Sequence, residues 1–216
     1  MKILLVDDHA VVRQGYASLL RALLPDVQVR EACDGEQALQ MVHEEIPNLV
    51  IMDIGLPGIS GLEVTRRLRQ RLPQLRVLFF SMHDELPLVR QALDAGALGY
   101  LTKTSSPEVL VEAVKRTLAG HAYIEQGLAT HLACNPMGEG SSDPRLRGMT
   151  QREFEIFVML AKGMPSRQIA EHLCISSKTV SNYLTLLKSK LQVSSQAELV
   201  HLAIDTGVIR LGLESA

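Results

Sequence analysis

Residues 3–9 read Ile-Leu-Leu-Val-Asp-Asp-His, four apolar residues followed by a pair of aspartates. A short apolar run bounded by polar residues is typical of a buried strand. An amphipathic segment follows at 11–24, and this alternation of a short β-rich run with a longer helical pattern continues through the first 120 residues. Repeated βα units predict a parallel sheet with helices on both faces.

The pattern predicts five strands and five helices in this region. The expected strands lie at 3–6, 27–30, 49–53, 77–81 and 99–102. The expected helices lie at 11–24, 36–45, 61–72, 85–95 and 107–118. We therefore expect an α/β fold with a doubly wound, five-stranded parallel sheet, whose chemistry gathers at the carboxyl ends of its strands.

The rest of the chain changes character. Residues 134–148 are dense in Gly, Ser and Pro and are expected to form a flexible linker, and 124–133 is expected to add one helical segment before it. Helical patterns then follow at 150–162, 166–173, 176–191 and 195–206, and Thr150 with Glu153 predicts a capping box at the first of them. We predict an α/β domain at 1–120, a linker at 121–148 and a four-helix domain at 149–216.

Composition excludes several classes of protein. Of the 216 residues 46% are hydrophobic and 21% charged, which is ordinary globular usage and excludes disorder, collagen and a coiled-coil rod. The net charge of −2 gives no bulk attraction to nucleic acid or anionic lipid. The apolar run at 3–6 is too short for a signal peptide or a membrane span, and no CxxC pair is present, so we expect a cytoplasmic protein with no membrane partner.

Carboxylates gather at the expected strand ends. Asp7 and Asp8 follow the first strand and Asp53 ends the third, so they should converge at one edge of the sheet. Like charges that lie so close favour a hard divalent cation with oxygen ligands, most simply Mg²⁺. Ser81 and Lys103 follow at later strand ends and could hold phosphoryl oxygens, which suits phosphoryl transfer onto Asp53.

The segment 176–191 has two faces. An inward stripe at helical spacing consists of Val180, Leu184, Leu187 and Leu191. Another face carries Ser181, Asn182 and Thr185, side chains that can meet base edges in the major groove. This segment lies in the acid-free stretch between Glu171 and Glu198, and its flanking cations are Lys178, Lys188 and Lys190. Periodicity alone leaves open a helical bundle that binds protein or caps another domain.

The first 120 residues resemble a response-regulator receiver domain, which is flavodoxin-like. The motifs that carry the resemblance are Val-Asp-Asp-His at 6–9, Met-Asp-Ile-Gly-Leu-Pro-Gly at 52–58, Ser-Met-His at 81–83 and Gly-Tyr-Leu-Thr-Lys at 99–103. The resemblance implies that Asp53 accepts phosphate from a partner histidine kinase. It also implies a Mg²⁺ site made by Asp7, Asp8, Asp53 and the Gly55 carbonyl, with Ser81, Tyr100 and Lys103 as switch residues. Tyr100 as a plain core residue remains an alternative to a rotamer switch.

Residues 148–209 resemble the LuxR-type helix-turn-helix domain, so that the whole chain resembles a NarL/FixJ response regulator. The motifs are Leu-Arg-Gly-Met-Thr-Gln-Arg-Glu, Leu-Ala-Lys-Gly-Met-Pro-Ser-Arg-Gln-Ile-Ala and Ile-Ser-Ser-Lys-Thr-Val-Ser-Asn-Tyr. The resemblance implies base reading of double-stranded DNA by Ser181, Asn182 and Thr185, phosphate contacts by Lys178, Lys188 and Lys190, and homodimerisation through 197–206.

Two positions depart from that family's pattern. Cys174 stands where glycine is frequent in the turn, and a residue with a side chain there is strained if φ is positive. Ser181 stands where a basic residue is common, which predicts fewer phosphate contacts and a shallow salt dependence of DNA binding.

Other candidate residues carry weaker signals. The seven histidines show no paired metal-ligand spacing, so each is expected to be structural or solvated, and His172 with Cys174 is too sparse for a zinc site. The arginines at 66, 67, 69 and 71 are expected to form a solvated helix face.

Three classes of function compete. The leading hypothesis is a two-component transcription factor in which phosphorylation of Asp53 favours a dimer that binds two DNA half-sites. The second is an enzyme that turns over phosphate esters through an aspartyl-phosphate. It is disfavoured because Gly55 stands where a general acid would be needed. The third is a protein-interaction module whose helical domain never touches DNA.

Overall fold

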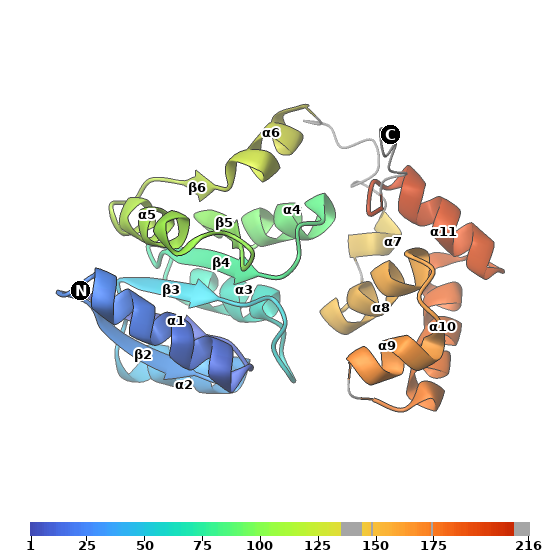
Figure 1. Ribbon diagram of the computed structural model, residues 1–216, viewed down its shortest axis with the longest axis horizontal. Helices are drawn as coiled ribbons and strands as arrows, with labels where there is room; N and C mark the ends of the chain where they lie inside the picture. The colour runs from blue at the N-terminus through green and yellow to red at the C-terminus, as the bar shows by residue number, and fades with distance from the viewer. Residues whose placement is uncertain (135–143, 148, 174, 210–216) are drawn as a thin grey trace. The chain divides into compact units, whose positions relative to one another are not determined.

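A computed structural model describes residues 1–134, 144–147, 149–173 and 175–209 of the chain (Figure 1). Cys174 lies outside these residues, and so do 135–143 and 148 of the predicted linker. The chain divides into two compact units. The first consists of Met1–Asp84 and Leu88–Thr130, and the second consists of Glu85–Pro87 and the residues from His131 onward.

The first unit is built on a parallel sheet. Its strands are β1 (Lys2–Val6), β2 (Gln28–Ala32), β3 (Leu49–Met52), β4 (Val77–Ser81), β5 (Gly99–Thr102) and β6 (Tyr123–Ile124). The spatial order is β2-β1-β3-β4-β5-β6, and every neighbouring pair is parallel. The order reverses at β1, so the chain is doubly wound, and the expected α/β class is confirmed.

Helices cover both faces of the sheet (Figure 1). They are α1 (Ala10–Leu23), α2 (Gly35–Glu44), α3 (Gly61–Arg71), α4 (Leu86–Asp94) and α5 (Pro107–Leu118). Ile3 and Leu5 of β1 pack in one buried cluster with residues of α1 and α5, because alternate side chains of a strand point to the same face. β1, β3, β4 and β5 are almost entirely buried, which explains why they appear in the sequence as continuous apolar runs.

The sheet has a sixth strand where five were predicted. β6 lies beside β5, with Tyr123 opposite Gly99 and Ile124 opposite Tyr100. Two residues are too few to show the alternation of a strand, and for this reason β6 was not predicted. Gly99 permits the close approach, since a Cβ on it would lie 2.5 Å from the Tyr123 carbonyl oxygen.

The bounds of other elements differ slightly from the predicted ones. β2 begins and ends one to two residues later than the 27–30 that was predicted. α6 (Gln126–Cys134) corresponds to the helical segment expected at 124–133, and a short helix, α7 (Pro144–Arg147), lies inside the range assigned to the linker. Gly96 follows α4 with φ +97°, the left-handed conformation in which glycine commonly ends a helix.

The second unit contains four longer helices. They are α8 (Gln151–Ala161), α9 (Ser166–His172), α10 (Ser177–Leu191) and α11 (Gln196–Asp205). Phe154 and Phe157 of α8 meet edge to face with ring centroids 6.1 Å apart, and the apolar stripe of α10 is buried at Val180, Leu187 and Leu191. The capping box is present at Thr150, whose hydroxyl accepts from the Glu153 amide while the Glu153 carboxylate accepts from the Thr150 amide. No helix among the described residues has the length and apolar composition needed to cross a bilayer.

Candidate functional sites

Backbone hydrogen bonds carry the acidic residues to one edge of the sheet. The Asp53 amide donates to the Val6 carbonyl at 2.9 Å, so the β1–β3 ladder continues past the end of β3. The Lys103 amide donates in the same way to the Ser81 carbonyl at 2.8 Å. The site residues are therefore positioned by the sheet itself, as their places at strand ends predicted.

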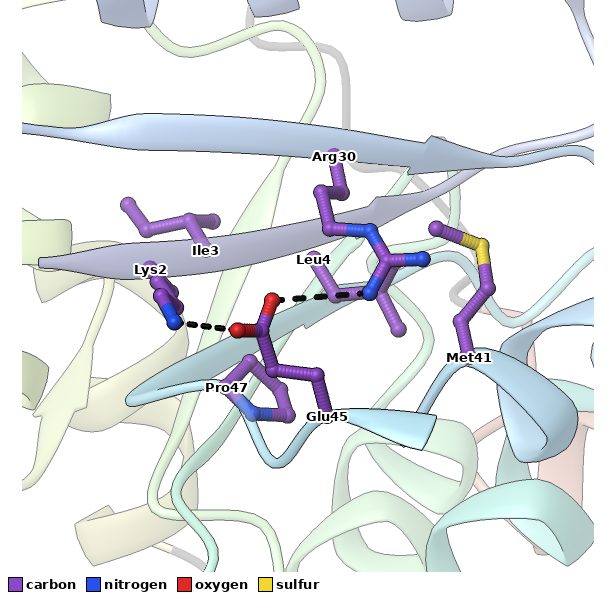
Figure 2. A pocket seen from close by; sticks show the side chains of 7 residues that line it. All are labelled: Lys2, Ile3, Leu4, Arg30, Met41, Glu45 and Pro47. Carbon is purple, nitrogen blue, oxygen red and sulfur yellow. Dashed lines mark hydrogen bonds and ion pairs between the residues drawn. The ribbon is translucent and has the colours of Figure 1, made fainter. Parts of the chain in front are cut away.

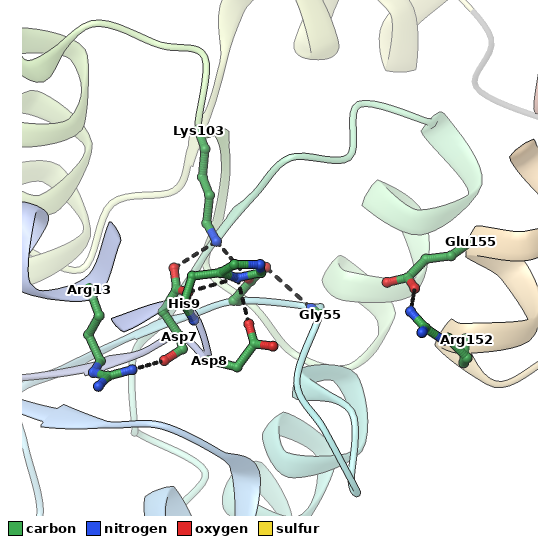
Figure 3. A network of polar contacts seen from close by, with 9 residues as sticks. Asp7, Asp8, His9, Arg13, Gly55, Lys103, Arg152 and Glu155 are labelled. Carbon is green, nitrogen blue, oxygen red and sulfur yellow. Dashed lines mark hydrogen bonds and ion pairs between the residues drawn. The ribbon is translucent and has the colours of Figure 1, made fainter. Parts of the chain in front are cut away.

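A buried lysine joins two of the aspartates (Figure 3). Lys103 Nζ lies 2.7 Å from Asp7 Oδ2 and 2.5 Å from Asp53 Oδ2. Only 6% of the Lys103 side chain is exposed, and both carboxylates are buried as well. Charge-assisted hydrogen bonds of this kind are about twice as strong as neutral ones, so the ammonium fixes both carboxylates in place.

The ionisation of the site follows from these contacts. Burial by itself lowers the pKa of Lys103, but the charges of Asp53 and Asp7 and the hydrogen bonds to both outweigh burial, and the pKa is raised above 10.5. At Asp8 burial raises the pKa, His9 lowers it, and the charges of Asp53 and Asp7 raise it further, so the pKa of Asp8 is raised above its usual 3.8. An added cation would therefore favour the charged form of Asp8.

The residues fit a divalent cation. One ligand atom from each of Asp7, Asp8, His9 and Asp53 lies within 4.8 Å of the others. Donors on opposite sides of a small divalent ion lie about 4.2 Å apart, so small side-chain movements would close the set around one. Three carboxylates face one ammonium, which leaves two negative charges to be balanced. Gly55 is close by, since its amide donates to Asp53 Oδ1 at 3.3 Å.

The other expected switch residues are Ser81, the last residue of β4, and Tyr100, which lies within β5. Ser81 is fully buried, and its hydroxyl accepts from the His83 amide at 3.4 Å. The Tyr100 ring is also fully buried and stacks on Phe79, while its hydroxyl donates to the His83 carbonyl at 2.7 Å. Tyr100 is a core residue in this conformation, and it is tied to the same loop as Ser81.

Several contacts of the site were not anticipated from the sequence. Arg13 of α1 donates to the Asp7 carbonyl at 2.6 Å, and the Tyr16 hydroxyl donates to the Lys103 carbonyl at 3.2 Å. Glu125 accepts from both the amide and the hydroxyl of Thr102, at 3.1 and 2.7 Å. The position of Arg13 and Tyr16 on the inner side of a helix that begins at the aspartates was the available signal, whereas nothing in the sequence pointed to Glu125.

A hollow at the amino end of β1 is not a ligand site (Figure 2). It is lined by Lys2, Ile3, Leu4, Arg30, Met41, Glu45 and Pro47. The Glu45 carboxylate forms ion pairs across the hollow with Lys2 and, at 3.6 Å, with Arg30. The remaining cavity of about 10 Å³ holds one water molecule at most.

In the second unit α10 presents a polar face. Lys178, Ser181, Asn182 and Thr185 are all exposed. The hydroxyls of Ser181 and Thr185 each donate 3.1 Å back to a carbonyl one turn earlier, which leaves their oxygens turned outward as acceptors. Among the described residues the side-chain amide of Asn182 has no hydrogen-bond partner, so it is available to bind a group outside the protein.

The three lysines of this helix differ. In the part of the chain that the structure describes, Lys178 has no ion-pair partner, and Lys188 is half-buried and interacts with Glu198 through its charge. Lys190 Nζ donates to Glu153 Oε2 at 2.6 Å, and Glu153 is buried. Lys190 therefore holds α10 against α8, and a phosphate contact would compete with that pair.

The first unit has a cluster of aspartates at one edge of its parallel sheet, and the second unit has a helix with an exposed polar face. Together these features are typical of a two-domain signalling regulator. Residues 3–115 match the family described as the response regulator receiver domain, and residues 147–203 match bacterial regulatory proteins of the luxR family. The chain belongs to the NarL/FixJ family of two-component response regulators, which regulate transcription and are not enzymes.

Individual relatives span nearly the whole chain. It is 69% identical over 212 residues to the transcriptional activator protein ExaE of Pseudomonas putida, covering 98% of this chain and 99% of that protein. It is 34% identical over 208 residues to response regulator UvrY of Escherichia coli strain K12, covering 96% and 95%. The crystal structure of response regulator ChrA from a heme-sensing two-component system is 32% identical, with a TM-score of 0.52, covering 96% of this chain and 98% of that one.

Proposed function

We propose that Asp53 accepts a phosphoryl group from a phosphohistidine of a sensor kinase and thereby controls dimerisation and sequence-specific DNA binding. Residues 1–120 would act as the receiver, 121–148 as the linker and 149–216 as the DNA-binding domain, in the cytoplasm where kinase and DNA meet. The observation that carries the proposal is the Lys103 ammonium held between Asp53 and Asp7 beside Asp8.

The residues of the site divide the work of the transfer. An Asp53 carboxylate oxygen attacks phosphorus, an O–P bond forms, and the N–P bond breaks with its electron pair left on the histidine nitrogen of the kinase. The Lys103 ammonium already contacts Asp53 Oδ2. During the transfer it would move to the phosphoryl oxygens and stabilise their negative charge. Asp7, Asp8, Asp53 and the Gly55 carbonyl would hold Mg²⁺, which when bound neutralises the charge of the transferring group.

Phosphorylation then acts on the strand ends. The phosphoryl group adds about 1.5 to 2 negative charges, which attracts Lys103 and gives the Ser81 hydroxyl a strong acceptor. A turn of the Ser81 hydroxyl toward phosphate ends its contact with the His83 amide. The Tyr100 hydroxyl donates to the carbonyl of the same His83. A movement of the His83 loop would therefore carry the Tyr100 side chain with it.

DNA binding is assigned to α10. Ser181, Asn182 and Thr185 would meet base edges, while Lys178 and Lys188 would contact phosphates. Lys190 would add a phosphate contact only at the expense of its pair with Glu153. With only Lys178 and Lys188 assigned to phosphates in each domain, a dimer should show a salt slope shallower than that of regulators with more phosphate contacts.

The phosphoacceptor is tested with Mg²⁺ and acetyl phosphate. The wild-type chain should take up one phosphate, Asp53→Asn none, and Asp26→Asn the wild-type amount, because Asp26 is exposed and distant from the carboxyl edge of the sheet. Phosphate uptake that survives Asp53→Asn contradicts the assignment. Repeated turnover of the donor would favour the enzyme hypothesis instead.

The DNA interface is tested by selection of bound fragments followed by binding measurements. Asn182→Ala should relax sequence preference, and Lys188→Ala should weaken all duplexes about uniformly. Ser189→Ala, an exposed change on the same helix, serves as the control. If neither of the first two variants alters binding to selected sites, α10 is not the recognition helix.

A further inference from the structure

The His9 ring contacts the cluster formed by Asp7, Asp8 and Asp53. The sequence analysis did not predict this contact. Its Nδ1 is 2.7 Å from Asp8 Oδ1 and 3.5 Å from Asp7 Oδ1, and Figure 3 shows the ring turned toward the aspartates. Its ring nitrogen counts with the three carboxylates in the set of donor atoms that lie within 4.8 Å of one another. The site thus offers a nitrogen donor besides its oxygens.

The backbone holds His9 at this position. The residue is the N-cap of α1 with φ −81° and ψ 101°, and its amide donates to Asp7 Oδ1 at 2.9 Å. Its side chain makes no capping hydrogen bond, and 68% of the side chain is exposed. Neither core packing nor helix capping accounts for the placement of the ring, so the carboxylates are its main contacts.

We propose that His9 is a ligand of the same cation site and shifts its preference from Mg²⁺ toward divalent ions that accept nitrogen ligands, such as Mn²⁺, Co²⁺ and Zn²⁺. Oxygen-only sites suit Mg²⁺, whereas imidazole binds first-row transition ions far better than it binds Mg²⁺. The proposal rests on the cation site of the proposed function and concerns which ion that site prefers.

A simpler role for His9 makes a different prediction. If the imidazole only offsets the charge of Asp8, its removal changes the affinity for every divalent ion by the same factor, because charge repulsion does not distinguish them. If it is a ligand, its removal weakens Co²⁺ and leaves Mg²⁺ nearly unchanged. The ratio of the Co²⁺ affinity to the Mg²⁺ affinity therefore separates the two roles.

The test measures both affinities by titration calorimetry on the full chain, together with the visible absorption of bound Co²⁺. In His9→Gln and His9→Ala the ratio should fall at least tenfold, and the Co²⁺ spectrum should change. His43→Gln, an exposed histidine on α2, should leave both as in the wild type. An unchanged ratio and spectrum in the His9 variants overturn the proposal.

Phosphate uptake by the same samples in Mg²⁺ distinguishes the two levels of failure. If Asp53 is still phosphorylated while the ratio is unchanged, the role of His9 is refuted and the proposed function stands. If the wild-type chain binds neither ion and takes up no phosphate, both are refuted.

Discussion

Gly61, the first residue of α3, lies directly against the backbone of Asp53, the proposed phosphoacceptor. A Cβ on Gly61 would lie 1.9 Å from the Asp53 carbonyl oxygen and 3.0 Å from Met52 Cγ. Its φ lies outside the left-handed range, so alanine is tolerated by the local backbone. Gly61→Ala therefore tests the close approach alone.

The size of the effect follows from the missing space. An ordinary contact would need about 3.4 Å, so α3 and the Asp53 carbonyl must separate by about 1.5 Å. Asp53 resists this movement through its amide bond to Val6 and its pair with Lys103. Overpacking of this kind costs about 1–3 kcal/mol, and displacement of a reacting group by about 1 Å costs on the order of 100-fold in rate.

The assays are calorimetry and the initial rate of phosphate uptake from acetyl phosphate. Gly61→Ala should lower the melting temperature of the receiver by about 3–10 °C and slow uptake by on the order of 100-fold. Gly15→Ala is the matched control, because Gly15 is an exposed helical residue with open space around its Cβ position. Gly15→Ala should stabilise the receiver by about 0.5–1 kcal/mol and leave uptake unchanged. A Gly61→Ala protein with wild-type melting and uptake would refute the reasoning.

Three further expectations concern other contacts. Glu125→Ala should speed hydrogen exchange in β6 and α6 and cost about 1–3 kcal/mol, because the Thr102 amide loses its side-chain acceptor. Unchanged exchange contradicts this expectation. Lys190→Ala should destabilise the second domain by about 1–3 kcal/mol in chemical denaturation, since Glu153 stays buried, whereas Lys178→Ala should weaken only DNA binding. The Ser194 hydroxyl and amide hold the pKa of Glu198 below 4.5, so the stability this adds is present above pH 4.5 and lost as pH falls through the lower folded value. Glu198→Gln should remove that dependence in acid denaturation.

The sequence predicted those parts of the structure that follow from period and strand direction. Asp7 and Asp53 each end an apolar run, and parallel strands bring such ends to one edge, so the cluster could be inferred without coordinates. The inward stripe of α10 was equally accessible, because helical spacing separates it from the polar face that begins at Ser181. The recognition role of that face still depends on the family resemblance.

The contacts that escaped prediction join segments distant in the chain. Glu125 and Thr102 are 23 residues apart, and Lys190 and Glu153 are 37 apart. No local period encodes such pairs, because they depend on how the elements pack. The space around Gly61 is likewise visible only once α3 lies against β3, and β6 is too short to show alternation.

The contacts of Lys103 limit how strongly phosphorylation can act on the second domain. A shift from about 1% to 99% active needs about 5.5 kcal/mol of differential stabilisation, and a hydrogen bond to a charged group contributes about 1.5–3 kcal/mol. Two to four contacts must therefore differ between the states. Lys103 is already paired in the unphosphorylated chain, so under the proposed function it would only exchange partners, and a new bond from Ser81 would not supply a full switch alone. Under the proposed function the remainder would have to come from the loop at His83, which Tyr100 contacts, and from contacts between the two chains of a dimer. For this reason we expect the phosphorylated monomer to be only partly active.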